Sequence, residues 1–160
     1  MKINLPLGLE LNCYINKRYR RTGICSQKFD EQNKHMLLWD FDDVGINDII
    51  NSLISIQWAF LLPDIYVIES SKNHYHAYCF AKRTLKEAIN ILSLTSYVCE
   101  DYLRLGMIRG YYTLRISLRQ GEQFKLVKKL LSKYPDEILP DEITLSDYIT
   151  YNGGNKNAKR

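Results

Sequence analysis

The feature that most constrains the fold is an apolar run that ends in acidic residues and leads directly into a helical repeat. Residues 35–42 read HMLLWDFD, which is typical of a buried strand. From Ile46 to Phe60, after Gly45, apolar residues recur at near-helical spacing, and Pro63 ends the predicted helix. This order predicts a strand-helix unit with carboxylates at the end of the strand.

The rest of the chain supplies further strands and helices. Two β-rich runs, residues 65–69 and 75–80, are separated by a turn-rich linker of hairpin length. Thr84 and Glu87 form a capping box that opens a helix through Leu92. Downstream we expect a helix over 96–105 closed by Gly106, a strand over 113–118, and a basic helix over 124–131 stopped by Pro135. The order predicts an α/β (α+β) fold, a mixed sheet covered by helices.

The length and composition suit one compact domain. We expect residues 1–150 to form it and residues 151–160 to be a flexible basic tail, in a chain of 160 residues that is 46 % hydrophobic. The longest apolar stretch, 46–62, is interrupted by polar side chains that a bilayer centre does not favour. The first residues lack the apolar region of a signal peptide, and four scattered cysteines favour free thiols. We therefore expect a cytoplasmic protein without membrane contact.

Basic residues gather in three segments of a chain whose net charge is +4. The clusters are Lys17, Arg18, Arg20, Arg21 and Lys28; Arg104, Arg109, Arg115 and Arg119; and Lys156, Lys159 and Arg160. A nucleic-acid backbone is contacted by clusters of this kind, but many solvated surfaces carry them as well.

Asp40 and Asp42 flank Phe41 at the end of the first predicted strand. Because side chains two residues apart in a strand point to the same face, the two carboxylates should lie together. Mg²⁺ or Mn²⁺ is commonly held by one or two carboxylates together with substrate phosphates. The alternative is that these acids end the strand and solubilise the following loop.

His74 and His76 flank Tyr75 and also share one strand face. A neutral imidazole there can contact a phosphate, ligate a metal or orient a base; otherwise one histidine is buried and hydrogen-bonded and the other lies at the turn. Arg109 and Arg115 can neutralise a triphosphate or pair with nearby acids. Four tyrosines can stack bases or pack in the core: Tyr75, Tyr78, Tyr111 and Tyr112.

Three segments, LLWDFDD, VIESSKNHYHAYCF, and an Asp followed by RGYYTLRIS, together resemble the archaeo-eukaryotic primase superfamily, the primases and primase-polymerases common on plasmids and viruses. That family has a hydrophobic strand ending in D-x-D, a hairpin strand with a small-x-His motif, a further acid and a downstream basic residue. The resemblance covers about residues 36–119. It departs at His74, where we would look for glycine, and at Asp101, which falls in a predicted helix instead of at a strand end.

The resemblance implies a mixed or antiparallel RRM-like sheet and metal-dependent nucleotidyl transfer. In this reading Asp40, Asp42 and Asp101 hold Mg²⁺ or Mn²⁺, with Glu100 as the competing third acid, and His76 contacts the incoming triphosphate. The remaining phosphate-binding residues are Arg115, Arg109, Ser71 and Lys72. The implied partners are single-stranded DNA, nucleoside triphosphates and a replicative helicase of a virus or plasmid, in the host cytoplasm if the protein is viral.

Two other functions fit parts of the pattern. His74-Tyr75-His76 also resembles the His-hydrophobic-His (HUH) metal motif of rolling-circle replication initiators, which are single-strand endonucleases. Such an enzyme needs a tyrosine nucleophile on a downstream helix, for which Tyr148 and Tyr151 are the candidates. The other alternative is a nucleic-acid-binding module that keeps the fold without the chemistry.

Overall fold

The computed structural model describes residues 2–4, 10–12, 20–28, 33–118 and 123–152. Its main elements are two antiparallel sheets and three helices, which confirms the predicted α/β (α+β) class with an antiparallel sheet. The four-stranded sheet has the order β4 (His35–Asp42), β6 (His74–Arg83), β5 (Ile65–Ser71), β8 (Lys125–Leu130). The three-stranded sheet has the order β7 (Thr113–Arg115), β3 (Arg20–Cys25), β9 (Tyr148–Asn152), and β1 (Lys2–Asn4) pairs with β2 (Glu10–Asn12).

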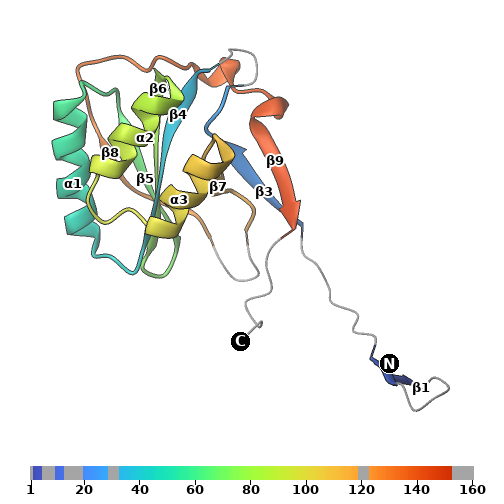
Figure 1. Ribbon diagram of the computed structural model, residues 1–160. Helices are drawn as coiled ribbons and strands as arrows, with labels where there is room; N and C mark the ends of the chain where they lie inside the picture. Colours follow the sequence, from blue (N-terminus) through green and yellow to red (C-terminus); the bar gives the residue numbers. More distant parts are fainter. Residues whose placement is uncertain (1, 5–9, 13–19, 29–32, 119–122, 153–160) are drawn as a thin grey trace.

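The helices are α1 (Ile46–Ala59), α2 (Leu85–Leu94) and α3 (Glu100–Arg109). In Figure 1 they lie to the left and in front of the four-stranded sheet, and β3 and β9 lie to its right. The predicted capping box opens α2, since Thr84 Oγ1 accepts from the Glu87 amide at 3.3 Å and Glu87 Oε2 accepts from the Thr84 amide at 2.8 Å. None of the described helices is long and apolar enough to cross a membrane.

The four-stranded sheet has an apolar layer on each face. Along β4, Leu37, Trp39 and Phe41 pack with residues of α1 and α2 in one core cluster. Met36 and Leu38 belong to a second cluster, together with Ile24 of β3 and Leu114 of β7. Because side chains alternate along a strand, Asp40 and Asp42 continue the face of Met36 and Leu38. The alternation therefore directs both carboxylates to the side where the second sheet lies.

The predicted basic helix over 124–131 is wrong, because residues 125–130 form strand β8. The spacing of the apolar residues fits a helix, but this segment pairs along β5, with Leu130 opposite Ile65 and Lys125 opposite Glu69. Gln57 of α1 donates a hydrogen bond of 3.1 Å to the Leu130 carbonyl and so holds the end of the strand. Pairing with a distant strand edge decides the conformation here, and a local pattern does not contain it.

The predicted helix over 96–105 is shifted. In the structure α3 begins at Glu100, runs through Gly106 and ends at Arg109; it is followed by Gly110, whose φ of 78° is the left-handed conformation common after a helix. Gly106 therefore lies inside the helix and does not end it. The ring of Tyr112 packs against this glycine, and a Cβ there would be 2.0 Å from Cε1 of Tyr112. Close packing, and not helix termination, explains this glycine. The strand predicted over 113–118 is shortened to β7.

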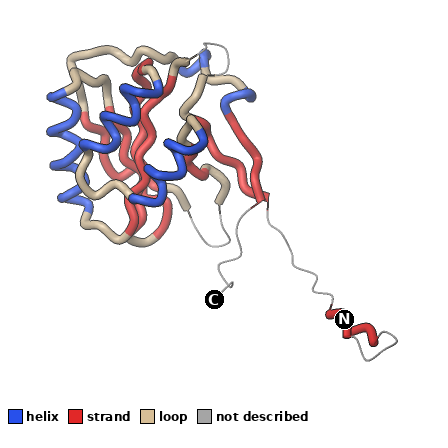
Figure 2. Tube along the Cα trace, in the orientation of Figure 1, coloured by secondary structure: helices blue, strands red, loops and turns tan. Residues whose placement is uncertain are grey.

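The chain between β8 and β9 runs as a loop with two short helical turns, Pro140–Glu142 and Leu145–Asp147, drawn in blue in Figure 2. Lys28 is fully buried below this loop, and its Nζ is 2.6 Å from Asp147 Oδ2. It is therefore unavailable to a nucleic-acid backbone. Strand β9 reaches Asn152, and the rest of the predicted tail, 153–160, lies outside the described residues.

Candidate functional site

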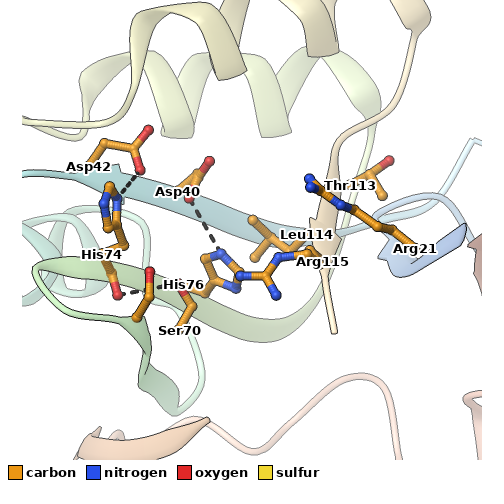
Figure 3. Close-up of a pocket in the computed structure, with 10 residues that line it drawn as sticks. Arg21, Asp40, Asp42, Ser70, His74, His76, Thr113, Leu114 and Arg115 are labelled. Atoms are coloured by element: carbon orange, nitrogen blue, oxygen red, sulfur yellow. Dashed lines mark hydrogen bonds and ion pairs between the residues drawn. The ribbon is translucent and has the colours of Figure 1, made fainter. Parts of the chain in front are cut away.

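The candidate site is formed where the polar ends of β4 and β6 lie side by side. In the antiparallel register Asp40 is opposite His76, and Asp42 is opposite His74. All four side chains line one pocket of about 320 Å³, which we call the carboxylate pocket, together with Arg21 of β3 and Ser70, Ser71, Thr113, Leu114 and Arg115. Figure 3 shows these side chains, labelled except for Ser71, converging from the two sheets. Of the predicted site residues, Asp40, Asp42, Ser71, His76 and Arg115 are thus brought together.

Asp40 and His76 form the buried part of the pocket. The Asp40 Oδ1 atom is 3.5 Å from His76 Nε2, and the two side chains are 25 % and 7 % exposed. Burial, followed by the negative charge of Asp42, raises the pKa of Asp40 to about 7. Burial, followed by the positive charge of Arg115, lowers the pKa of His76 to about 4. The distance would allow an ion pair between Asp40 and His76. Because the buried imidazole is neutral at pH 7, the contact is instead a polar contact in which His76 carries no charge.

The other ring nitrogen of His76 faces Tyr78. The Nδ1 atom lies 3.3 Å from the Tyr78 hydroxyl, which is itself buried two residues further along β6. Burial raises the pKa of Tyr78, so its hydroxyl stays protonated and can donate a hydrogen bond to Nδ1. In that arrangement Nε2 carries the imidazole proton and presents it to Asp40 or to a ligand oxygen in the pocket.

Asp42 and His74 form the open part of the pocket. Asp42 Oδ1 is 2.6 Å from His74 Nδ1, and the side chains are 46 % and 35 % exposed. The backbone turns tightly beside both residues: Asp43, directly after β4, has a φ of 56°, and Asn73, directly before β6, has a φ of 59°. The Asp43 amide donates to the Asn73 carbonyl at 3.0 Å. This bond joins the two strand ends and holds the carboxylate and imidazole side by side.

Positive charge comes from the second sheet. Arg115 of β7 donates from Nη1 to the Ser117 carbonyl at 2.6 Å, and its guanidinium carbon is 5.6 Å from the centre of the Phe124 ring. The ring of Phe124 also lies against His76, at 6.2 Å between ring centres. Arg21 of β3 adds a second guanidinium to the pocket wall. The pocket therefore combines carboxylates at the end of one sheet with guanidinium groups from the other.

The remaining predicted residues lie elsewhere. Asp101 and Arg109 are on α3 and line a neighbouring cavity that shares Asp40 with the carboxylate pocket. The Asp101 side chain is 76 % exposed and pairs with Arg104 at 2.7 Å. Glu100, the competing third acid, is exposed at the start of α3, and Lys72 is exposed in the turn between β5 and β6.

The tyrosines considered for base stacking are divided by burial. Tyr75 and Tyr112 belong to the core cluster against the helices, and Tyr78 belongs to the second cluster. Tyr111 is partly exposed and lines the neighbouring cavity. The two candidate nucleophiles, Tyr148 and Tyr151, lie on strand β9 and not on a helix, and Tyr148 packs against the second cluster.

Within the part of the chain that the structure describes, no three His, Cys, Asp or Glu side chains are arranged to hold a metal ion. Two carboxylates, Asp40 and Asp42, nevertheless line the same pocket as Arg115. A hard divalent cation needs only one or two protein carboxylates when phosphate oxygens and water complete its coordination. The donor set therefore fits Mg²⁺ or Mn²⁺ bound together with a phosphate ligand.

Sequence reasoning missed Arg21 as a site residue because strand β3 was not predicted. Its sequence, RRTGIC, contains a glycine and has only a short apolar end. The basic cluster around it was recognised, but a position on the pocket wall follows only from the pairing of β3 with β7, in which Gly23 is opposite Arg115. Phe124, which supports Arg115, was assigned to the predicted helix.

Comparison with known proteins identifies no relative: no family model, no curated protein and no solved structure matches this chain.

Proposed function

We propose that this protein is a metal-dependent nucleotidyltransferase of the primase or primase-polymerase type, serving a virus or plasmid replication system. The observation that carries the proposal is the pairing of Asp40 and Asp42 on β4 with His76 and His74 on β6, in one pocket with Arg115. Carboxylates for a divalent cation and guanidinium groups for phosphate oxygens are the two requirements of phosphoryl transfer.

The residues have separable tasks in this proposal. Asp40 and Asp42 would hold Mg²⁺ or Mn²⁺, which when bound neutralises charge on the transferred phosphoryl group. His76 donates from Nε2 to a phosphate oxygen, because Tyr78 supports the tautomer that carries the proton there. Arg115 and Arg21 orient the triphosphate and compensate its charge, with Ser71 as a further hydrogen-bond donor. Asp101 as a third ligand, and Arg109 and Lys72 as phosphate contacts, stay predictions.

The proposal includes single-stranded DNA and nucleoside triphosphates as substrates, a replicative helicase as a partner, and the cytoplasm as location. These follow from the resemblance and from the chemistry of the pocket. The weight of catalysis would rest on fixed charges around the phosphates, since the positions of Asp40, His76 and Arg115 are set by paired strands.

The test measures incorporation of labelled nucleotides on a single-stranded template, with and without primer, in Mg²⁺ or Mn²⁺. We expect metal-dependent extension by the wild type and its loss in Asp40→Asn with Asp42→Asn. Asp141→Asn, at an exposed acid outside the pocket, is the matched control and should retain activity. Binding of Mn²⁺, followed by electron paramagnetic resonance, should be lost in the same double variant. Strand cleavage or a covalent tyrosine–DNA adduct without synthesis would instead indicate the endonuclease. DNA binding that ignores divalent cations would indicate a non-catalytic module.

A further inference from the structure

A second cavity of about 260 Å³ lies between α3 and β7, directly beside the carboxylate pocket. The two share Asp40 and Thr113 in their walls. The start of α3 is fixed to the strand end, because the Cys99 amide donates to the Asp40 carbonyl at 2.9 Å. The carboxylate pocket and the α3–β7 cavity are therefore adjacent at Asp40 and Thr113.

Two residues that line the α3–β7 cavity, Tyr112 and Thr113, have hydroxyl groups without a hydrogen-bond partner among the described residues. Thr113 Oγ1 and Tyr112 Oη are buried and make no hydrogen bond to any described residue. Tyr112 is only 1 % exposed, and both residues line the cavity. Buried hydroxyls in folded proteins are usually satisfied, and a bound polar ligand is one way to satisfy them. Thr113 lines both cavities, so it lies between the carboxylate pocket and the α3–β7 cavity.

The charges of the two cavities differ. Each cavity is lined by two aspartates, but the carboxylate pocket has two arginines, Arg21 and Arg115, whereas the lining of the α3–β7 cavity has one, Arg109. A triphosphate is therefore better placed against the two arginines. The wall of the α3–β7 cavity also includes Tyr111, whose ring can stack on a flat base.

We propose that the α3–β7 cavity binds the sugar and base of the nucleotide whose triphosphate lies in the carboxylate pocket. Thr113 hydrogen-bonds the sugar at the boundary, and Tyr111 stacks on the base. This assignment rests on the proposed function; it gives Thr113 a role that the sequence analysis did not assign, and it selects Tyr111 among the four tyrosines considered for base stacking. It makes the nucleoside part of the ligand, and not the triphosphate alone, a source of affinity.

The experiment compares binding of ATP and of inorganic triphosphate to the whole protein in the presence of Mn²⁺, by titration calorimetry. We expect the wild type to bind ATP at least about tenfold more tightly than inorganic triphosphate. Thr113→Val and Tyr111→Ala should each weaken ATP binding by about five- to tenfold and leave inorganic triphosphate unchanged. Arg115→Ala should weaken both ligands.

Thr113→Ser is the matched control, because it keeps the hydroxyl and should keep the affinity for ATP. Thr113→Val removes a hydroxyl that has no partner in the described protein, so its thermal unfolding should match the wild type. Equal affinity of the wild type for ATP and inorganic triphosphate, or unchanged ATP binding in both Thr113→Val and Tyr111→Ala, would overturn the nucleoside assignment and leave the phosphate pocket intact. Failure of either ligand to bind the wild type would overturn the proposed function and this inference with it.

Discussion

Asp40 lies directly opposite His76 in the pairing of β4 with β6, and its Oδ1 is 3.5 Å from the imidazole Nε2. The pKa values of the two groups move in opposite directions, to about 7 for Asp40 and about 4 for His76. Burial is the main cause of both shifts, because each group is more stable without its charge when it is removed from water. The pair can therefore bind a cation through Asp40 or a phosphate oxygen through His76. When no ligand is bound, burial of the two polar groups lowers the folding stability.

Asp40→Asn should stabilise the ligand-free protein at pH 8. The folded-state pKa of Asp40, about 7, lies above the ordinary value of the unfolded chain. The free energy of unfolding therefore decreases as pH rises toward 7, because the carboxyl ionises more easily in the unfolded chain than in the folded protein. Asn removes that charge, and we expect a gain of about 1 to 3 kcal/mol at pH 8 that shrinks as pH falls to 5. Urea unfolding at both pH values measures it, with the exposed Asp101→Asn as control. A loss of stability in Asp40→Asn at pH 8 would contradict the assigned shift.

His76 should remain neutral in the folded protein down to about pH 4. Because its folded-state pKa is below the unfolded value of about 6.5, its contribution to stability is present above pH 6.5 and is lost as pH falls toward 4. Nitrogen-15 chemical shifts of the imidazole, recorded without metal, report its charge directly. An apparent pKa of 6.5 or higher would mean that His76 and Asp40 form an ion pair.

Mn²⁺ affinity should rise with pH and level off above about pH 7. A carboxyl group must lose its proton to ligate a metal, and the pKa of Asp40 is raised to about 7. Below that value we expect the apparent affinity to fall by up to about tenfold for each pH unit. Electron paramagnetic resonance of free Mn²⁺ measures the binding. An affinity independent of pH between 5 and 8 would exclude Asp40 as a ligand, and Asp42→Asn tests the second carboxylate.

The strand and helix elements from residue 35 to residue 94 could be predicted from the sequence. Their signals are local: alternating or continuous apolar runs, a turn between β5 and β6, and the Thr84 capping box. Once the strands were placed, the period of two residues put Asp40 with Asp42 and His74 with His76. In the structure β4 and β6 are adjacent, and the two aspartates lie opposite the two histidines. This pairing forms the β4–β6 part of the site.

The remainder of the site depends on contacts between distant segments. Arg21 is brought to the pocket by the pairing of β3 with β7. Asp101 lies in the first turn of α3 and lines the neighbouring cavity. Strand β8 has the apolar spacing of a helix and is a strand because the edge of β5 was open to it. None of these features is contained in the local pattern of the residues concerned.

Lys28→Met should destabilise the protein by about 3 to 5 kcal/mol. Lys28 Nζ is 2.6 Å from Asp147 Oδ2, the side chains are 2 % and 0 % exposed, and Nζ also donates to the Glu142 carbonyl. Without the ammonium, Asp147 is a buried carboxylate with no counter-charge. Adding Asp147→Asn should recover most of the loss, because the amide oxygen can still accept from the Thr144 amide, a bond of 2.9 Å in the wild type. Urea unfolding of single and double variants tests this, and additive losses would contradict it.

Gly106→Ala should destabilise the protein although alanine favours a helix. In an exposed helix interior the change would stabilise by about 1 kcal/mol. Here the new Cβ would lie 2.0 Å from Cε1 of Tyr112, a fully buried ring with little room to move. We expect a net loss of about 1 to 3 kcal/mol, as for other overpacked cores. Gly45→Ala is the matched control, since its Cβ would meet only the end of the Asp48 side chain, at 3.2 Å. Thermal unfolding of the two variants measures the difference. A Gly106→Ala variant as stable as the wild type would mean that α3 packs less closely against Tyr112 than in the structure.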